Sequence, residues 1–136
     1  MAKHVVAAVG EIPPGGRKVV VVERREIGVF NVDGELFALR HRCPHQGGPL
    51  CEGHLLRGVE SSGPGDYRYG PDLLVACPWH GWEFDLRTGR SWFDPARTRV
   101  RPYPVELAPG AALVEGPYVV DTFPVSVEED YVVVEV

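Results

Sequence analysis

The chain has few cysteines and no long apolar run, and each shortage excludes a class of protein. Its 136 residues include three cysteines. These are too few for the disulfide framework of a small secreted protein, and in a cytosolic chain they are more often metal ligands or plain thiols. No segment has the apolar length of a membrane-spanning helix. The apolar run near the N-terminus meets Glu11 and two prolines before it could serve as a signal-peptide core, so we predict a cytoplasmic protein.

Basic charge is also scarce. Lys and Arg number 14 against 19 Asp and Glu, which gives a net charge of -5, and no basic run stands out. Nucleic acids and anionic membranes bind basic surfaces, so we expect neither as a partner and predict a basic docking partner instead. A chain of this length forms one domain, and it leaves no room for a second, catalytic one.

Helical periodicity is missing as well. No apolar pattern of period 3.6 persists for three turns, whereas segments rich in Val, Ile, Tyr and Phe recur with turn residues between them. We therefore expect a nearly all-β fold. The predicted strands are 3–8, 17–23, 26–32, 35–41, 73–77, 82–85, 99–107, 117–125 and 131–136.

Turn residues separate these strands. Asp33-Gly34 is typical of a tight hairpin, and the charged run 23–26 is expected to form another hairpin turn. The segment 85–89, DLRTG, predicts a β-turn. Residues 57–72 are dense in Gly, Pro and Ser and indicate either a long surface loop or a small hairpin. Prolines in two similar segments, YPVE from 103 and FPVS from 123, favour edge strands.

Two short stretches carry the chemistry. HRCPHQGGPL (41–50) and ACPWHGWEFD (76–85) each combine one cysteine and one histidine on a loop rich in Pro and Gly. Proline restricts such a loop, and glycine lets its backbone approach a metal and aim N–H groups at anionic sulfur. Two unrelated turns with chance cysteines explain the doubled pattern poorly. The sequence thus offers four ligands of two kinds.

Two metal centres fit these ligands. Two Cys and two His can close a tetrahedral zinc site, but such sites usually take both cysteines from one knuckle and both histidines from another element. Here each loop supplies one of each. If the cysteines held one iron and the histidines another, the centre would be a mixed-ligand 2Fe-2S cluster.

The spacing C-x-H followed by C-x-x-H-G-W-x-F-D resembles Rieske-type ferredoxins and the Rieske domains of ring-hydroxylating oxygenases, over about residues 3–107. The resemblance implies one Rieske 2Fe-2S cluster per chain. It also implies that Cys43 and Cys77 ligate the inner iron, and that His45 and His80 ligate the outer iron through Nδ1 and form the electron's exit. The neighbouring residues that would surround the cluster or form the docking surface are Pro44, Gln46, Gly47, Gly48, Leu50, Pro78, Trp79, Gly81 and Trp82.

The resemblance also implies the architecture, a Rieske-type antiparallel β-sandwich with a small cluster-binding subdomain formed by the two loops. We expect a single domain over 1–136, with this subdomain at about 41–92. The chain departs from the family in an inserted loop at about 57–72 and in a C-terminal extension at about 108–136. The insertion leaves the shape of the docking surface beside the cluster open.

High-potential members of the family link the two loops by a disulfide and donate hydroxyl hydrogen bonds to the cluster. Here Gly48 and Trp79 take the disulfide positions, and Trp82 and Phe84 take the hydroxyl positions. Fewer hydrogen bonds to sulfur leave the reduced cluster less stabilised, and net acidity acts in the same direction. We therefore expect a reduction potential near the low end of the Rieske range, roughly -150 mV.

The function that the resemblance implies is a soluble electron-transfer protein, not an enzyme by itself. It would carry single electrons from a flavin-dependent NAD(P)H reductase to a terminal oxygenase. An oxygenase needs a further iron site with two His and a carboxylate. The remaining histidines His4, His41 and His54 lack that spacing. The alternatives are a fixed subunit of a larger oxidoreductase, such as a nitrite reductase small subunit, and a structural zinc module.

The third cysteine, two of the remaining histidines and the three tryptophans have simpler explanations than a role as ligands. Cys51 has no partner cysteine, and we expect a small buried hydrophobic residue rather than a reactive thiol. We predict that His41 and His54 are solvated. Three tryptophans are expected to shield the cluster and pack the core: Trp79, Trp82 and Trp92.

Overall fold

The computed structural model describes residues 3–44, 47–79, 81–92, 94–110, 118–119 and 130–136. The strands are β1 (Lys3–Ala8), β2 (Arg17–Val22), β3 (Arg25–Val32), β4 (Glu35–Arg40), β5 (His54–Gly63), β6 (Asp66–Ala76), β7 (Glu83–Asp85), β8 (Pro102–Tyr103), β9 (Val105–Pro109), β10 (Tyr118–Val119) and β11 (Asp130–Glu135). Two short 3-10 turns accompany them, η1 (Val9–Glu11) and η2 (Leu50–Glu52). The predicted all-β fold is confirmed. No helix in the described ranges could cross a membrane.

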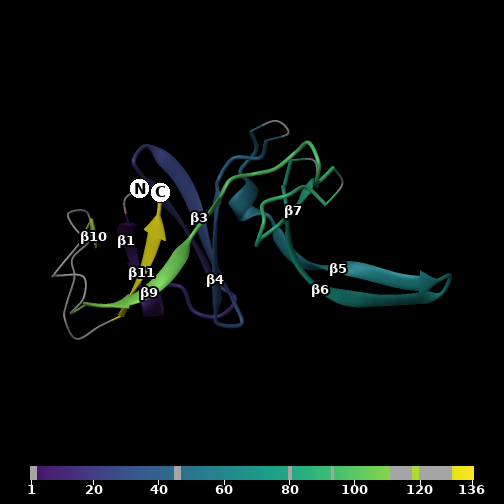
Figure 1. Ribbon diagram of the computed structural model, residues 1–136, viewed down its shortest axis with the longest axis horizontal. Helices are drawn as coiled ribbons and strands as arrows, with labels where there is room; N and C mark the ends of the chain where they lie inside the picture. The colour runs from purple at the N-terminus through teal and green to yellow at the C-terminus, as the bar shows by residue number, and fades with distance from the viewer. Residues whose placement is uncertain (1–2, 45–46, 80, 93, 111–117, 120–129) are drawn as a thin grey trace. The chain divides into compact units, whose positions relative to one another are not determined.

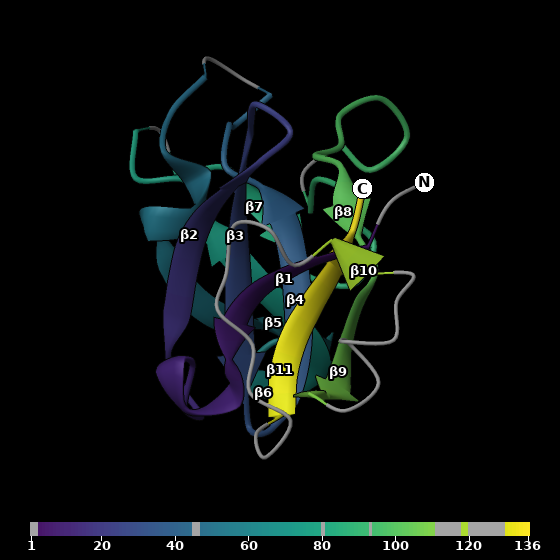
Figure 2. The same cartoon turned by 90° about the vertical axis from the view of Figure 1, so that its left-hand side faces the viewer.

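The chain divides into two compact units. Unit 1 comprises residues 1–40 and 103–136, and unit 2 comprises residues 41–102. Unit 1 contains two sheets, with strand orders β10-β1-β11-β9 and β2-β3-β4-β8. Figure 2 shows β11 running between β1 and β9. These neighbours are antiparallel, whereas β10 pairs with β1 in parallel.

Unit 1 is held together by small apolar side chains from both of its sheets. Valine predominates, and its branched side chain suits the pleated surface of a strand. The main cluster consists of Val6, Ala7, Ile12, Val22, Ile27, Val29, Ala38, Tyr103, Val132, Val134 and Val136. Along β11 these residues alternate with Tyr131 and Val133, which belong to a second cluster with Val5 and Ala108. The sheet shared by both clusters is therefore buried on both faces.

Two tight turns connect β2, β3 and β4. Asp33 and Gly34 have φ angles of 53° and 92°, and Glu23 and Arg24 have φ angles of 49° and 66°. Two consecutive positive φ angles are the requirement of a two-residue hairpin turn whose twist matches the strands. Both predicted hairpins are confirmed. The turn at Glu23 and Arg24 meets this requirement without a glycine.

Unit 2 is built on a three-stranded sheet in the order β5-β6-β7. The pairing of β5 with β6 runs from His54↔Ala76 to Gly63↔Asp66, but β7 pairs only with the last residues of β6. The far half of the hairpin is thus a two-stranded ribbon, with β5 and β6 side by side (Figure 1). Of the two structures expected for residues 57–72, the chain adopts the hairpin. A ribbon with no third strand needs no apolar alternation, which explains why the sequence left both a loop and a hairpin open for these residues.

One predicted strand is interrupted by a proline. The expected strand 99–107 is confirmed in part: strand structure begins only at Pro102 and is divided into β8 and β9 at Pro104, which has no N–H to donate. β9 lies at an edge of its sheet, as its proline-containing sequence suggests. Of the expected strand 117–125, only Tyr118–Val119 lies within the described residues. The expected edge segment 123–126 lies outside them.

Candidate metal centre

The first candidate loop follows β4 and closes on itself through its backbone. The Gly47 amide donates to the Cys43 carbonyl at 2.7 Å, and the Cys43 amide donates to the Gly48 carbonyl at 2.9 Å. Gly47 has a φ angle of 77°, a conformation that side chains disfavour. The glycine in this position is therefore a requirement of the turn.

The second loop, between β6 and β7, repeats this closure at the same offsets. The Gly81 amide donates to the Cys77 carbonyl at 2.8 Å, the Cys77 amide donates to the Trp82 carbonyl at 2.7 Å, and Gly81 has a φ angle of 72°. Each loop thus starts at a cysteine and turns at a glycine four residues later. These cysteine and glycine amides are taken by carbonyl oxygens, so only other loop amides could point at sulfur.

A glycine brings the two loops into contact. A Cβ atom added at Gly48 would lie 2.9 Å from Cys77 Sγ and 2.9 Å from two ring atoms of Trp79. Any side chain at this position would displace the second loop. The absence of a side chain at Gly48 therefore allows the first loop to pack directly on the cysteine of the second.

The two thiols are suited to an iron–sulfur centre. Cys43 and Cys77 are 2 % and 3 % exposed, and none of the three cysteines forms a disulfide. Thiolate sulfur is the usual protein ligand of such clusters, and burial excludes water from them. Within the described ranges, no three His, Cys, Asp or Glu side chains are grouped as a metal site. Two of the expected ligands, His45 and His80, lie outside those ranges, as does Gln46.

The other predicted residues divide by exposure. Leu50 in η2 and Gly48 are buried, Gly47 and Trp82 are half-buried, and the exposed members are Pro44, Pro78, Trp79 and Gly81. Leu50 is 0 % exposed, so it can support the loop but cannot contact a partner.

The prediction that the tryptophans pack the core is wrong for two of them. Trp79 is 57 % exposed and Trp92 is 45 % exposed, so neither packs the core. Trp82 and Trp92, with Gly81 and Glu83, line an open groove of about 540 Å³. The indole rings are therefore at the surface, where they can contact another molecule.

Cys51 and His41 form a structural pair behind the first loop. Cys51 is fully buried, as predicted, and its amide donates to His41 Nδ1 at 3.1 Å. The prediction that His41 is simply solvated is wrong, because its ring is half-buried and accepts this bond. His54, at the start of β5, is exposed as expected.

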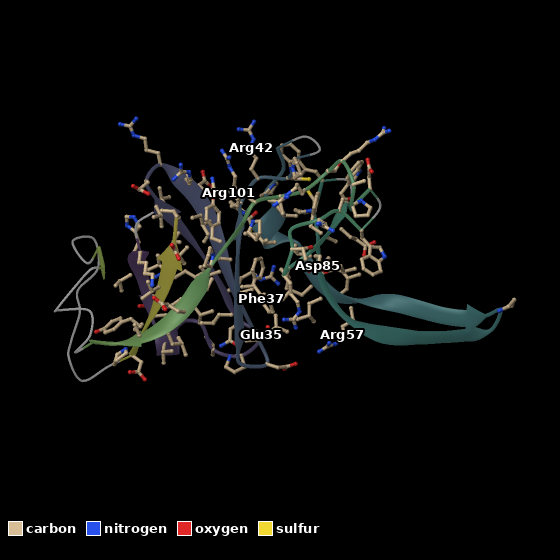
Figure 3. All side chains as sticks on the ribbon, in the orientation of Figure 1. Glu35, Phe37, Arg42, Arg57, Asp85 and Arg101 are labelled. Atoms are coloured by element: carbon tan, nitrogen blue, oxygen red, sulfur yellow. The ribbon has the colours of Figure 1, made fainter. Side chains whose placement is uncertain are left out.

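Three neighbours of the loops were not singled out from the sequence. The side chain of Arg42, labelled in Figure 3, packs against the first loop, because its Nε would lie 3.2 Å from a Cβ atom added at Gly47. A Cβ at Gly53 would overlap the Ala76 carbonyl oxygen, and one at Gly89 would overlap that of Val100. Glycine is frequent in this chain, so only the tertiary contacts distinguish these two.

The chain is similar to several known proteins. A family model described as the Rieske [2Fe-2S] domain matches residues 2–104. The chain is 33% identical over 110 residues to the 3-phenylpropionate/cinnamic acid dioxygenase ferredoxin subunit of Photorhabdus laumondii, covering 81% of this chain and 90% of that protein.

Two solved structures share the fold. The ferredoxin of carbazole 1,9a-dioxygenase from Nocardioides aromaticivorans matches with a TM-score of 0.59 and 24% identity, over 97% of each chain. A putative NADH-dependent nitrite reductase small subunit from Mycobacterium tuberculosis matches with a TM-score of 0.67 and 21% identity, over 99% of this chain and 96% of that one.

Proposed function

Because the chain belongs to the Rieske [2Fe-2S] domain family, we propose that it is the one-electron carrier of a ring-hydroxylating dioxygenase system. It takes single electrons from a flavin-dependent NAD(P)H reductase and passes them to a terminal oxygenase. The observation that supports this most directly is the pair of matching loops. Each loop places one buried cysteine at its start, and Gly48 lies against the sulfur of Cys77.

The proposed ligands are Cys43 and Cys77 for one iron and His45 and His80 for the other. A bound Rieske cluster supplies reversible storage of one electron. The chain's own contribution is to hold the two thiols away from water and to fix the loops by four backbone hydrogen bonds. Preorganised loops keep the ligands in place when the charge of the cluster changes.

The test is visible absorption and electron paramagnetic resonance of the pure protein, as isolated and after dithionite. A red-brown protein that bleaches and gives the low-average-g rhombic signal of mixed Cys/His ligation supports the proposal. His45→Cys and His80→Cys should each abolish that signal, whereas the matched control Cys51→Ser should retain it. A colourless protein with one zinc per chain would replace the electron carrier with a structural zinc module.

A second candidate is a fixed subunit of a larger oxidoreductase, such as a nitrite reductase. The β5–β6 ribbon supports it, because a ribbon without a third strand offers extra surface to a permanent partner. Stoichiometric co-purification with an untagged partner would favour the subunit. A monomer that is repeatedly reduced and reoxidised with added reductase would favour the carrier.

The remaining assignments follow from this proposal. Residues 41–92 form the cluster-binding subdomain of a single Rieske domain, with an insertion at 57–72 and an extension at 108–136. The protein acts in the cytoplasm, where its reductase draws on NAD(P)H. Its potential is near the low end of the Rieske range, which redox titration of the same spectroscopic signal would measure.

A further inference from the structure

Unit 2 carries a small strand arrangement that extends from the second loop. β7 is bridged to the segment 90–92 through Phe84↔Ser91, and that segment is bridged to the next through Arg90↔Arg99. Bridged residues share a face of a sheet, and successive residues alternate between faces. Phe84, Ser91 and Val100 are buried on one face.

The opposite face carries charge and tryptophan. We call it the outer face, and its residues are Glu83, Asp85, Arg90, Trp92 and Arg99. The Trp92 amide donates to the Glu83 carbonyl at 2.8 Å, which places Trp92 beside the groove that Trp82 also lines. The outer face therefore begins at the residues that close the second loop.

Two arginines lie directly opposite each other on this face. Like charges at paired positions across two strands destabilise the pairing. Arg90 and Arg99 are both exposed, and neither guanidinium forms an ion pair within the part of the chain that the structure describes. Asp85 lies across from Arg90 on the same face, and its carboxylate also accepts the amides of Arg87 and Thr88. Arg99, in contrast, has Arg90 opposite it. The arrangement costs stability in the isolated chain.

Further arginines surround this pair. Arg87, Arg97 and Arg101 are exposed in the same unit, and Arg101 is labelled in Figure 3. Unit 2 has eight arginines, no lysine and seven acidic residues, while unit 1 has six basic and twelve acidic residues. The net charge of -5 is thus carried by unit 1, and unit 2 is close to +1.

We propose that the outer face is a docking surface for an acidic patch on the redox partner, with Arg90 and Arg99 binding its carboxylates. Arginine binds planar carboxylates through paired hydrogen bonds, and tryptophan and arginine are the residues most enriched among interface hot spots. A nucleic acid fits less well, because a phosphate backbone needs an extended basic surface and unit 2 has a net charge of only about +1. The inference rests on the proposed electron-carrier function and adds the charge of the partner.

The test compares two redox probes of opposite charge, acidic flavodoxin hydroquinone as electron donor and basic cytochrome c as electron acceptor. In the first reaction flavodoxin loses one electron and the cluster gains it; in the second the cluster loses it to the haem. Stopped-flow rates are measured with the full-length holoprotein. Arg99→Glu should slow the flavodoxin reaction about fivefold at low salt, and high salt should remove the difference.

Arg24→Glu is the matched control, because it reverses an exposed arginine in unit 1. It should change the flavodoxin rate less than Arg99→Glu does, and Arg99→Glu should not slow the cytochrome c reaction. Arg99→Gln gives the same comparison without a new negative charge, should the reversal prevent folding.

The outcomes separate the two proposals. If the wild type exchanges electrons with neither probe, the carrier function fails. If it exchanges electrons but Arg99→Glu and Arg24→Glu behave alike, the docking surface is overturned. A salt-sensitive dimer in sedimentation that Arg99→Glu dissociates would also overturn it, because the outer face would then bind the acidic unit of a second copy.

Discussion

The two units reach a stable structure by different means. Unit 1 packs valine-rich strands from two sheets around shared apolar clusters. In unit 2, the loops close through matching backbone bonds, and three glycines sit where a Cβ would collide with a neighbour: Gly48, Gly53 and Gly89. Both units bury apolar side chains, among them Leu74, Phe84 and Leu86 in unit 2. The comparison indicates that the loops of unit 2 depend in addition on the absence of a side chain at these glycines.

Charge separates the units as well. Net acidity led to the expectation of a basic docking partner, but the acidic excess belongs to unit 1. The unit with the candidate ligands presents arginines. A net charge summed over the chain is therefore a poor guide to the surface that meets a redox partner.

The largest expected effect is in unit 2. Gly53→Ala should destabilise the chain by roughly 3–5 kcal/mol, because its Cβ would overlap the Ala76 carbonyl oxygen and neither backbone can yield cheaply. We expect loss of the cluster absorbance and an earlier urea midpoint. Gly63→Ala is the control, since nothing lies within 4 Å of an added Cβ there. Equal behaviour of the two variants would contradict the role of glycine.

In unit 1 the corresponding substitution removes side-chain volume from the apolar core. Ile27 is fully buried in the main cluster, and Ile27→Ala should lower the free energy of unfolding by about 3 kcal/mol through lost burial and a cavity. Urea unfolding measures this. In the molecules that remain folded the cluster spectrum should be unchanged, and an altered spectrum would show that the units are not independent in this respect.

A smaller effect of opposite sign is expected at the β2–β3 turn. Arg24 has a φ angle of 66°, which costs a residue with a side chain roughly 1 kcal/mol relative to glycine. Arg24→Gly should therefore raise the thermal midpoint. Arg17→Gly, in the adjacent strand, should lower it. A fall in both variants would mean that the Arg24 side chain stabilises the turn.

The smallest effect is electrostatic. The hydrogen bond from Lys18 Nζ to Glu11 at 2.8 Å, helped by the Ala8 amide, lowers the pKa of the Glu11 carboxyl below its usual 4.5. A lowered folded-state pKa stabilises the fold above the ordinary pKa, and this contribution disappears as pH falls through the folded value. Glu11→Gln should cost less than about 0.5 kcal/mol at neutral pH, because the pair is exposed. The difference from wild type should shrink in urea titrations as the pH is lowered below 4.5, and a constant difference would exclude this ion pair as its source.

The sequence by itself determined the strands and turns that depend on neighbouring residues along the chain. Alternating valines predict strands because the strand period is two, and Asp33-Gly34 predicts its hairpin because those residues accept positive φ angles. Cys43, Cys77 and the glycines after them predict two tight loops, and the structure has both. His45 and His80 as ligands stay a prediction.

Only the tertiary structure decided which distant residues meet. The contact of Gly48 with Cys77, the collision that forbids a side chain at Gly53, the bond from Cys51 to His41 and the facing pair Arg90 and Arg99 all join segments apart in the chain. The exposure of Trp79 and Trp92 was decided in the same way. Composition and periodicity describe what each residue prefers, whereas burial and contact depend on which partner the folded chain places beside it.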